Sequence, residues 1–338
     1  MEAMRRRRIR NTVLLVLLLG IVVGAGIGGI YLLRGGDMDI KSLNQPYSVG
    51  VEFSNTLSAK ENLKAEPFAE HLCVIGKDVP SDTVTVQNYQ HGLLLDMNSR
   101  KVLYAWHVYD QIYPASITKI ITALLALENG NMSDTVVITE EDVTLEEEAQ
   151  VCGFMPGDRL TMEQLLRCLL VYSGNDAAAA IARHVGGSEE GFVQMMNRYA
   201  ASLGCTGTHF TNPHGLHSPD HYTTAYDIYL MLNRASEFPL FTEITQLPEY
   251  TVQYTRSDGS EVSTRLIATD HYLTGEATAP RNVTILGGKT GTTSEAGNCL
   301  AILAQDVYGE PYTAIVLGAP SKEVLYSQMN SVLQLIDS

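Results

Sequence analysis

The sequence has few cysteines, and their number and spacing exclude a complete disulfide framework. Five occur in 338 residues, and no two of them form a C-x-x-C pair. An odd number cannot be fully paired within one chain. We interpret the five as packing residues. One disulfide stays an alternative, because we expect the chain beyond its N-terminal segment to lie outside the cytoplasm. They are Cys73, Cys152, Cys168, Cys205 and Cys299.

Positive charge is scarce beyond the N-terminus. The chain holds 23 basic and 38 acidic residues. Six arginines and one glutamate lie in residues 1–34, which leaves 17 basic and 37 acidic residues in the remainder. A body with a net charge of −20 would repel phosphates, so we expect no nucleic-acid partner.

Residues 11–33 contain no charged side chain and are rich in leucine, valine and isoleucine. A helix needs roughly 20 apolar residues to cross the hydrocarbon core. Five arginines precede the segment, and basic residues stay on the cytoplasmic side. We therefore expect residues 1–34 to form a single-pass anchor with a cytoplasmic N-terminus and an extracytoplasmic body. A cleaved signal peptide, which would release a secreted protein, stays an alternative, although no A-x-A-like site follows Leu33.

The rest of the chain divides into a linker over 35–82 and an organised domain over 83–338, in which strands flank a helical middle. This order predicts an α+β fold with an antiparallel sheet built from both ends and an inserted helical lobe, with a cleft between them. Strands are expected at 92–97, 101–106, 283–286, 299–304 and 312–317. Helices are expected at 116–129, 161–171, 175–185, 188–203, 223–234 and 322–336.

Three short patterns of polar side chains follow one another along this domain. They are S-x-x-K at 116–119, S-x-N at 173–175 and K-T-G at 289–291. Each is weak by itself, and a second S-x-N occurs at 42–44, in the linker. S-x-x-K and K-T-G occur once each. Their order and contexts indicate one catalytic site.

Ser116 and Lys119 lie three residues apart at a predicted helix start, so their side chains share one face. A serine hydroxyl is a weak nucleophile until a neighbouring base removes its proton. A lysine serves as that base only when it is neutral, which requires burial or nearby positive charge. The helix N-terminus also offers backbone N–H groups to a developing oxyanion. The alternative for Lys119 is a solvated helix lysine without a role.

The other two patterns suit the walls of a cleft. Ser173 and Asn175 flank Gly174 at a predicted break between helices, where small polar side chains can point inward. Their alternative role is ordinary helix capping. Lys289 and the hydroxyls that follow it suit a substrate carboxylate, and Gly291 permits close approach. The alternative for this third pattern is a surface turn.

These patterns, in this order, resemble the penicillin-binding protein and serine β-lactamase superfamily. The surrounding residues resemble the low-molecular-mass D-alanyl-D-alanine carboxypeptidases more closely, over residue 87 to the C-terminus. The likeness rests on Y-P-A-S-I-T-K at 113–119, S-G-N-D-A-A at 173–178, T-N-P-H-G-L at 211–216 and G-K-T-G at 288–291.

The resemblance implies a serine-type carboxypeptidase that removes the terminal D-alanine from peptidoglycan stem pentapeptides without a cofactor. It implies that Ser116 attacks the carbonyl between the two terminal D-alanines and that Lys119 takes its proton. Ser173 would relay a proton to the departing D-alanine, and Asn175 would orient Lys119 and the peptide. β-Lactams would acylate Ser116 as covalent inhibitors.

The resemblance also assigns the substrate-binding residues. Lys289, Thr290 and Thr292 would hold the terminal carboxylate beside Gly291. Backbone N–H groups of Ser116 and Thr292 would form the oxyanion hole. Many members of the family carry an extra β-rich domain and a C-terminal amphipathic anchor. We expect the N-terminal segment to serve as the anchor here.

Three alternatives deserve comparison. A class A β-lactamase needs a glutamate after S-x-N, and residues 191–236 contain none. Gly174 also replaces the aspartate of S-D-N. A metal site among four histidines, with Cys205 and Asp220 nearby, matches no zinc spacing, so we expect no metal. These histidines are His209, His214, His217 and His221. A non-catalytic β-lactam or cell-wall sensor stays open.

Overall fold

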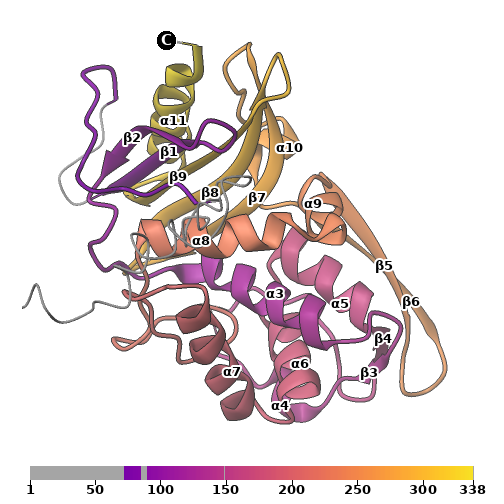
Figure 1. Cartoon of the computed structure of the whole chain (residues 1–338). Helices are drawn as coiled ribbons and strands as arrows, with labels where there is room; N and C mark the ends of the chain where they lie inside the picture. The colour runs from indigo at the N-terminus through magenta and orange to yellow at the C-terminus, as the bar shows by residue number, and fades with distance from the viewer. Residues whose placement is uncertain (1–71, 85–89, 148, 338) are drawn as a thin grey trace, which may run out of the picture. The chain divides into compact units, whose positions relative to one another are not determined.

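The computed structural model describes residues 72–84, 90–147 and 149–337 (Figure 1). The predicted anchor over 1–34 and most of the predicted linker lie outside these residues. Among the helices of the described ranges, none has both the length and the apolar character needed to cross a membrane.

A five-stranded antiparallel sheet combines strands from both ends of the folded chain. Its order is β2-β1-β9-β8-β7, so N-terminal β1 pairs with C-terminal β9. This confirms the predicted α+β class and the sheet built from both ends. The strands are β1 His91–Asp96, β2 Lys101–Trp106, β7 Val283–Thr293, β8 Gly297–Asp306 and β9 Pro311–Ala319.

Both faces of this sheet are buried, which explains its continuous apolar strands. Leu93 and Leu95 of β1 face a core shared with the helical lobe, whereas Leu94 faces a second core beneath the C-terminal helix. Side chains alternate between faces along a strand, so one apolar run supplies both cores. Each fully buried leucine contributes about 1.5–3 kcal/mol relative to exposure. Helix α11, Lys322–Leu333, packs against β9 and covers the second core (Figure 1).

The helical lobe lies between β2 and β7 in the chain, as predicted. Its longest helices match the predicted ones to within a few residues. The α-helices are α3 Lys119–Asn129, α4 Glu140–Val143, α5 Met162–Arg167, α6 Asn175–Gly186, α7 Glu189–Ser202, α8 Ala225–Ser236, α9 Pro239–Thr245 and α10 His271–Thr274. Two short 3₁₀ helices are η1 Ala115–Thr118 and η3 Gln334–Asp337, and η2 Cys168–Tyr172 is a π-helix.

The lobe also carries a second sheet that was not among the predicted strands. Its order is β3-β4-β5-β6. The β5–β6 hairpin extends from the lobe (Figure 1) and buries few of its side chains. β5 does alternate polar residues with Tyr250, Val252 and Tyr254, which is the pattern of a half-buried strand, but we did not predict a strand there. The strands are β3 Thr135–Val137, β4 Arg159–Thr161, β5 Glu249–Thr255 and β6 Glu261–Ile267.

The folded domain begins before residue 83, the predicted boundary. Cys73 and Ile75 are buried in the core, with 1% and 3% of their surface exposed. The Cys73 backbone N–H donates to the Tyr229 hydroxyl at 2.9 Å, and Val79 bridges to Ala105. Residues 72–84 belong to the same compact unit as the rest of the described domain. Weak periodicity concealed this segment because its contacts are isolated anchors rather than a helix or strand.

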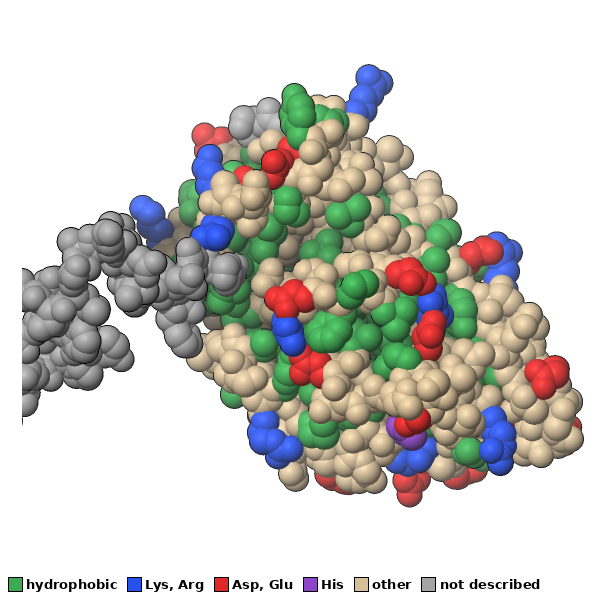
Figure 2. Space-filling view, turned by 45° about the vertical axis from the view of Figure 1, so that its right-hand side comes forward, with side chains coloured by type: hydrophobic (Ala, Val, Ile, Leu, Met, Phe, Trp, Pro, Cys, Tyr) green, Lys and Arg blue, Asp and Glu red, His purple; other side chains and the backbone are tan. Residues whose placement is uncertain are grey.

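Charged side chains on the lobe surface are interspersed by sign. Figure 2 shows acidic and basic groups in neighbouring clusters on the face it presents, without a continuous basic patch there. Among the ion pairs of the described lobe, Arg167 contacts Glu163 at 2.7 Å, and Arg234 contacts Glu128 at 2.6 Å. Exposed pairs of this kind contribute roughly 0–1 kcal/mol each.

Candidate active site

The first pattern lies on a tight turn that leads into α3. The predicted helix begins as the short turn η1, and α3 starts only at Lys119. Ala115, just before Ser116, has a φ of 47°, which is left-handed backbone that costs a non-glycine residue about 1–2 kcal/mol. Ser116 follows in the first turn, where backbone N–H groups have no acceptor within the helix. Gly215 packs on this turn so closely that a Cβ there would lie 1.9 Å from the Ala115 carbonyl.

Lys119 is fully buried, although lysine is rarely found in a core. Its Nζ lies 2.8 Å from Ser116 Oγ. It also lies 2.7 Å from Asn175 Oδ1 and 2.8 Å from the His214 carbonyl oxygen. The alternative of a solvated helix lysine is therefore wrong. The amine joins the first two patterns to the T-N-P-H-G-L loop.

These contacts explain how Lys119 can act as a base. Burial, together with the nearby charge of Lys289, lowers its pKa well below the usual value for lysine. A neutral amine has two N–H groups and one lone pair. Asn175 Oδ1 and the His214 carbonyl can only accept, so they take both N–H groups. The lone pair then faces Ser116 Oγ, whose hydroxyl can donate to it.

The second pattern lies where the π-helix η2 ends. Ser173 has left-handed backbone, with φ 68° and ψ 34°, and Asn175 opens α6. Both side chains are buried. Asn175 bonds to Lys119, and the Ser173 hydroxyl accepts from Lys289 Nζ at 3.0 Å. Neither of these bonds is a helix cap, so capping does not account for the pattern. Non-glycine residues with positive φ and π-turns both cluster at functional sites.

A packing constraint explains the glycine between them. A Cβ on Gly174 would lie 2.4 Å from Cys152 Sγ and 2.9 Å from Asp176 Oδ1. The Asp176 carboxylate accepts from the backbone N–H groups of Cys152 and Gly153, both at 3.0 Å. It thereby fixes the preceding loop against α6. A larger residue at 174 would displace that loop.

The third pattern lies inside β7, which extends beyond its predicted end to Thr293. The surface-turn alternative is therefore wrong. Lys289 has 1% of its surface exposed, and its Nζ donates to Ser173 Oγ and, at 2.9 Å, to the Thr290 carbonyl. Burial lowers the pKa of Lys289 to about 7, against the opposing effect of the Asp270 carboxylate.

The five free cysteines of the described domain form no disulfide.

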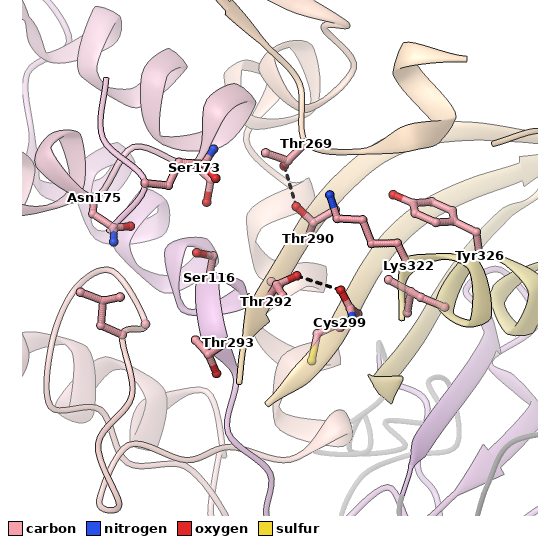
Figure 3. A pocket seen from close by; sticks show the side chains of 16 residues that line it. Ser116, Ser173, Asn175, Thr269, Thr290, Thr292, Thr293, Cys299, Lys322 and Tyr326 are labelled. Atoms are coloured by element: carbon pink, nitrogen blue, oxygen red, sulfur yellow. Dashed lines mark hydrogen bonds between the residues drawn. The ribbon is translucent and has the colours of Figure 1, made fainter. Parts of the chain in front are cut away.

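A cavity of about 270 Å³ lies between the lobe and β7 (Figure 3). Ser116, Ser173 and Asn175 line one wall, and Thr290 and Thr292 line the opposite wall. Gly291 also lines it, and a Cβ there would lie 3.0 Å from Ser116 N and 2.9 Å from the Pro114 carbonyl. The strand can approach the turn Ala115–Thr118, which we call the nucleophile turn because it carries the predicted nucleophile Ser116, only because residue 291 is glycine. All eight predicted site residues thus lie at or directly behind this cavity.

The loop over 211–216 supports the nucleophile turn, a role that its sequence did not reveal. The Pro213 carbonyl accepts from Thr122 Oγ1 at 2.6 Å, just before His214 contacts Lys119. His221 Nε2 lies 2.8 Å from Thr118 Oγ1, and burial lowers the pKa of His221 to about 3. These contacts hold the end of the serine turn and the first turn of α3 that follows it. In the sequence, this loop was marked only by its T-N-P-H-G-L motif, which contributed to the family resemblance.

The four clustered histidines have separate partners. His209 Nδ1 lies 2.6 Å from the Asp220 carbonyl oxygen, and His217 packs edge-on against Tyr113. His214 and His221 are buried on the nucleophile side. Within the described ranges, no three histidine, cysteine or carboxylate side chains converge as metal ligands.

Further residues line or support the cavity without any sequence signal. Thr269 Oγ1 lies 2.5 Å from Thr290 Oγ1, and Thr292 Oγ1 lies 3.2 Å from Asn298 Oδ1. Asp270 is buried behind them, and its Oδ2 has no hydrogen-bond partner among the described residues. The remaining lining includes Gln150, Leu216, Lys322, Leu325 and Tyr326.

Comparisons with known proteins agree with this geometry. DacF of Bacillus subtilis, a D-alanyl-D-alanine carboxypeptidase, is 32% identical over 247 residues, covering 72% of this chain. The chain spans about three fifths of the length of this relative and of other curated relatives. A D-alanyl-D-alanine carboxypeptidase structure from Mycobacterium tuberculosis H37Rv superposes with a TM-score of 0.66 at 29% identity, covering 78% of this chain and 94% of that one.

The DD-transpeptidase of Streptomyces K15 is similar in structure, with a TM-score of 0.66 at 26% identity over 72% of this chain and 95% of that one. The Peptidase_S11 family model, described as D-alanyl-D-alanine carboxypeptidase, matches residues 80–321. That match contains the nucleophile turn, the π-helix junction and β7. The chain therefore belongs to the Peptidase_S11 family of D-alanyl-D-alanine carboxypeptidases.

Proposed function

We propose that this protein is a serine-type D-alanyl-D-alanine carboxypeptidase that removes the terminal D-alanine from peptidoglycan stem pentapeptides. The observation that carries the proposal is the 2.8 Å contact between the buried Lys119 Nζ and Ser116 Oγ, at the wall of an open cavity. A serine paired with a neutral amine in this way is an activated nucleophile. Family membership supplies the substrate class.

Acylation begins when Lys119 takes the Ser116 proton and Oγ attacks the carbonyl between the two D-alanines. Backbone N–H groups of Ser116 and Thr292 receive the oxyanion. The position of Ser116 in the first turn of η1, with β7 packed against it, supports this assignment. Asn175 holds the Lys119 amine in place through its 2.7 Å contact.

The leaving D-alanine needs a proton on its nitrogen. Ser173 is placed to relay to it the proton that Lys119 took from Ser116, because the Ser173 hydroxyl lies in the cavity wall and contacts Lys289 Nζ behind it. That transfer returns Lys119 to its neutral form. Water then enters and hydrolyses the acyl-enzyme, with Lys119 again as the base. Among the described residues that line the cavity, none is a carboxylate. This supports hydrolysis of peptides over the rapid deacylation of a class A β-lactamase.

The positive charge of Lys289 holds the terminal carboxylate through the K-T-G strand. Lys289 itself is buried, so its field acts behind the hydroxyls of Thr290 and Thr292, which face the cavity. Gly291 leaves room for the peptide to lie along the strand. β-Lactams carry a similar carboxylate and acylate Ser116 as substrate mimics.

The two lysines predict a bell-shaped pH dependence. Activity rises with pH on the acidic side because Lys119 must lose its proton. It falls above about pH 7, by up to about tenfold per pH unit, because Lys289 is protonated below its pKa of about 7 and neutral above it. The check is kcat/KM for a D-Ala-D-Ala peptide and its C-terminal amide. The alkaline fall should be steeper for the free acid, and equal profiles would contradict the role given to Lys289.

Release of D-alanine from a pentapeptide tests the proposed function. The wild type should release D-alanine over many turnovers and turn over benzylpenicillin far more slowly. Fast penicillin turnover would instead favour a β-lactamase, and acylation without D-alanine release would favour a sensor. Because the Streptomyces K15 relative is named a DD-transpeptidase, an added amine acceptor shows whether aminolysis competes with hydrolysis.

We further propose that the chain is anchored in the cell membrane by residues 1–34, with the catalytic domain outside. The uncharged run over 11–33 and the arginines before it support this placement. Fractionation of cells should recover the full-length chain with the membrane and leave the domain accessible to protease in spheroplasts. A shortened chain in the medium would establish the cleaved signal instead.

A further inference from the structure

The five free thiols of the described domain differ in what they contact. Three of them donate to backbone carbonyl oxygens 3.6 to 3.7 Å away: Cys73 to Asp96, Cys205 to Asp227 and Cys299 to Ala296. The other two are Cys152 and Cys168, and no backbone acceptor of this kind is found for either within the described ranges. Their thiols instead contact each other: a hydrogen bond with Cys168, followed by burial, raises the pKa of Cys152 well above its usual value.

Both cysteines of this pair pack around Gly174, the residue between Ser173 and Asn175. A Cβ on Gly174 would lie 2.4 Å from Cys152 Sγ, and the Gly174 N–H donates to the Cys168 carbonyl at 3.3 Å. Cys168 belongs to the buried core, and Cys152 packs against that core. Two cysteines can be bridged without backbone movement only when their side chains point toward each other, which this packing provides.

The pair joins two segments that form one wall of the cavity. Cys168 begins the π-helix η2, which ends at Ser173 with its left-handed backbone. Cys152 lies in the loop before β4, and two residues earlier the Gln150 carbonyl accepts from Asn175 N at 2.8 Å. Gln150 lines the cavity together with Ser173 and Asn175. A covalent link between this loop and η2 would therefore brace the wall that carries the second pattern.

We propose that Cys152 and Cys168 are an oxidation site, where a disulfide ties the loop over 150–154 to η2 behind Ser173. Cys152 reacts first, because it is partly exposed whereas Cys168 is fully buried. A peroxide is the oxidant: hydrogen peroxide converts the Cys152 thiol to a sulfenic acid and releases one water. The Cys168 sulfur then attacks the Cys152 sulfur, and the sulfenic hydroxyl leaves with the Cys168 proton as a second water. One S–S bond thus replaces two S–H bonds, and the peroxide takes up the two electrons.

Peptide mapping of the folded, full-length chain tests the proposal. Arg159 and Arg167 lie between the two cysteines, so trypsin separates them unless a disulfide holds the fragments together. After treatment with hydrogen peroxide at mildly alkaline pH, which favours the reactive thiolate, a non-reducing digest should contain the linked pair. The linked protein should melt roughly 5–10 °C above the reduced one, because a closed loop of this length constrains the unfolded chain. Dithiothreitol should reverse both changes.

Cys152→Ala should lose both the linked pair and the rise in melting temperature. Cys205→Ala, which removes a buried thiol outside the pair, should keep both. The wild type before and after reduction gives the same comparison even if a variant folds poorly. Cys152 and Cys168 that both stay free for alkylation after peroxide treatment, a link to another cysteine, or a linked protein that melts with the reduced one would overturn the proposal. These readouts involve no peptide substrate, so they stand apart from the test of the proposed function.

Discussion

Replacing Lys119 by methionine is expected to slow acylation of Ser116 by about 10²- to 10⁴-fold, the range that general-base catalysis supplies. Methionine fills a similar volume but offers no lone pair to the serine hydroxyl. It also leaves Asn175 Oδ1 and the His214 carbonyl without the amine that both contact. Each unsatisfied buried acceptor costs about 1–3 kcal/mol, so a lower melting temperature should accompany the loss of activity.

The rate of labelling by a fluorescent penicillin measures this effect independently of peptide hydrolysis. Lys101→Met is the matched control, because Lys101 is exposed on β2 and distant in the sheet from β7. It should acylate at the wild-type rate. A Lys119→Met protein that is folded by circular dichroism yet acylates within a factor of a few of the wild type would exclude Lys119 as the base.

Replacing Ser116 by alanine is expected to abolish covalent labelling and to reduce D-alanine release by at least about 10⁴-fold. Among the described contacts of Lys119 Nζ, the Ser116 hydroxyl is the one group that can act as a nucleophile. Its removal leaves the backbone of the turn intact, because the hydroxyl contacts Lys119 Nζ, whereas Gly215 packs on the Ala115 carbonyl. The melting temperature should therefore change little, which separates lost chemistry from lost folding.

Ser99→Ala supplies the matched control for this variant, because Ser99 lies exposed in the β1–β2 turn. It should label and hydrolyse like the wild type. Covalent labelling that persists in Ser116→Ala would place the nucleophile elsewhere. The nearest other hydroxyl on that wall, Ser173, could then be tested in the same assay.

Local patterns predicted the nucleophile pair because both residues belong to one turn of backbone. Spacing alone places Ser116 and Lys119 on one face, and Pro114 and Gly130 mark the ends of that helical stretch. The lowered pKa of Lys119 could not be predicted from its local sequence. It depends on burial and on Lys289, which is 170 positions away in the chain and is brought near by the β7 strand.

The residues that support or line the site from other elements could not be predicted for the same reason. Asp270, Thr269 and Lys322 reach the site from a short loop and from the start of α11, and nothing in their local sequence distinguishes them from surface residues. Gly291 was expected to permit close approach, and it lies within β7, where a Cβ would be 3.0 Å from Ser116 N. Gly288 lies in the same strand, where a Cβ would be 2.1 Å from the Ala301 carbonyl oxygen. The second of these constraints depends on contacts that local sequence does not show.

The most direct test of the account is mass spectrometry of the enzyme quenched during turnover of a D-Ala-D-Ala peptide. Proteolysis should yield the fragment containing Ser116 with an added mass equal to the peptide less its terminal D-alanine. The adduct should be absent in Ser116→Ala and should decay as free product forms. Release of D-alanine with no adduct on Ser116, or with the adduct on another residue, would contradict the acyl-enzyme at the centre of this account.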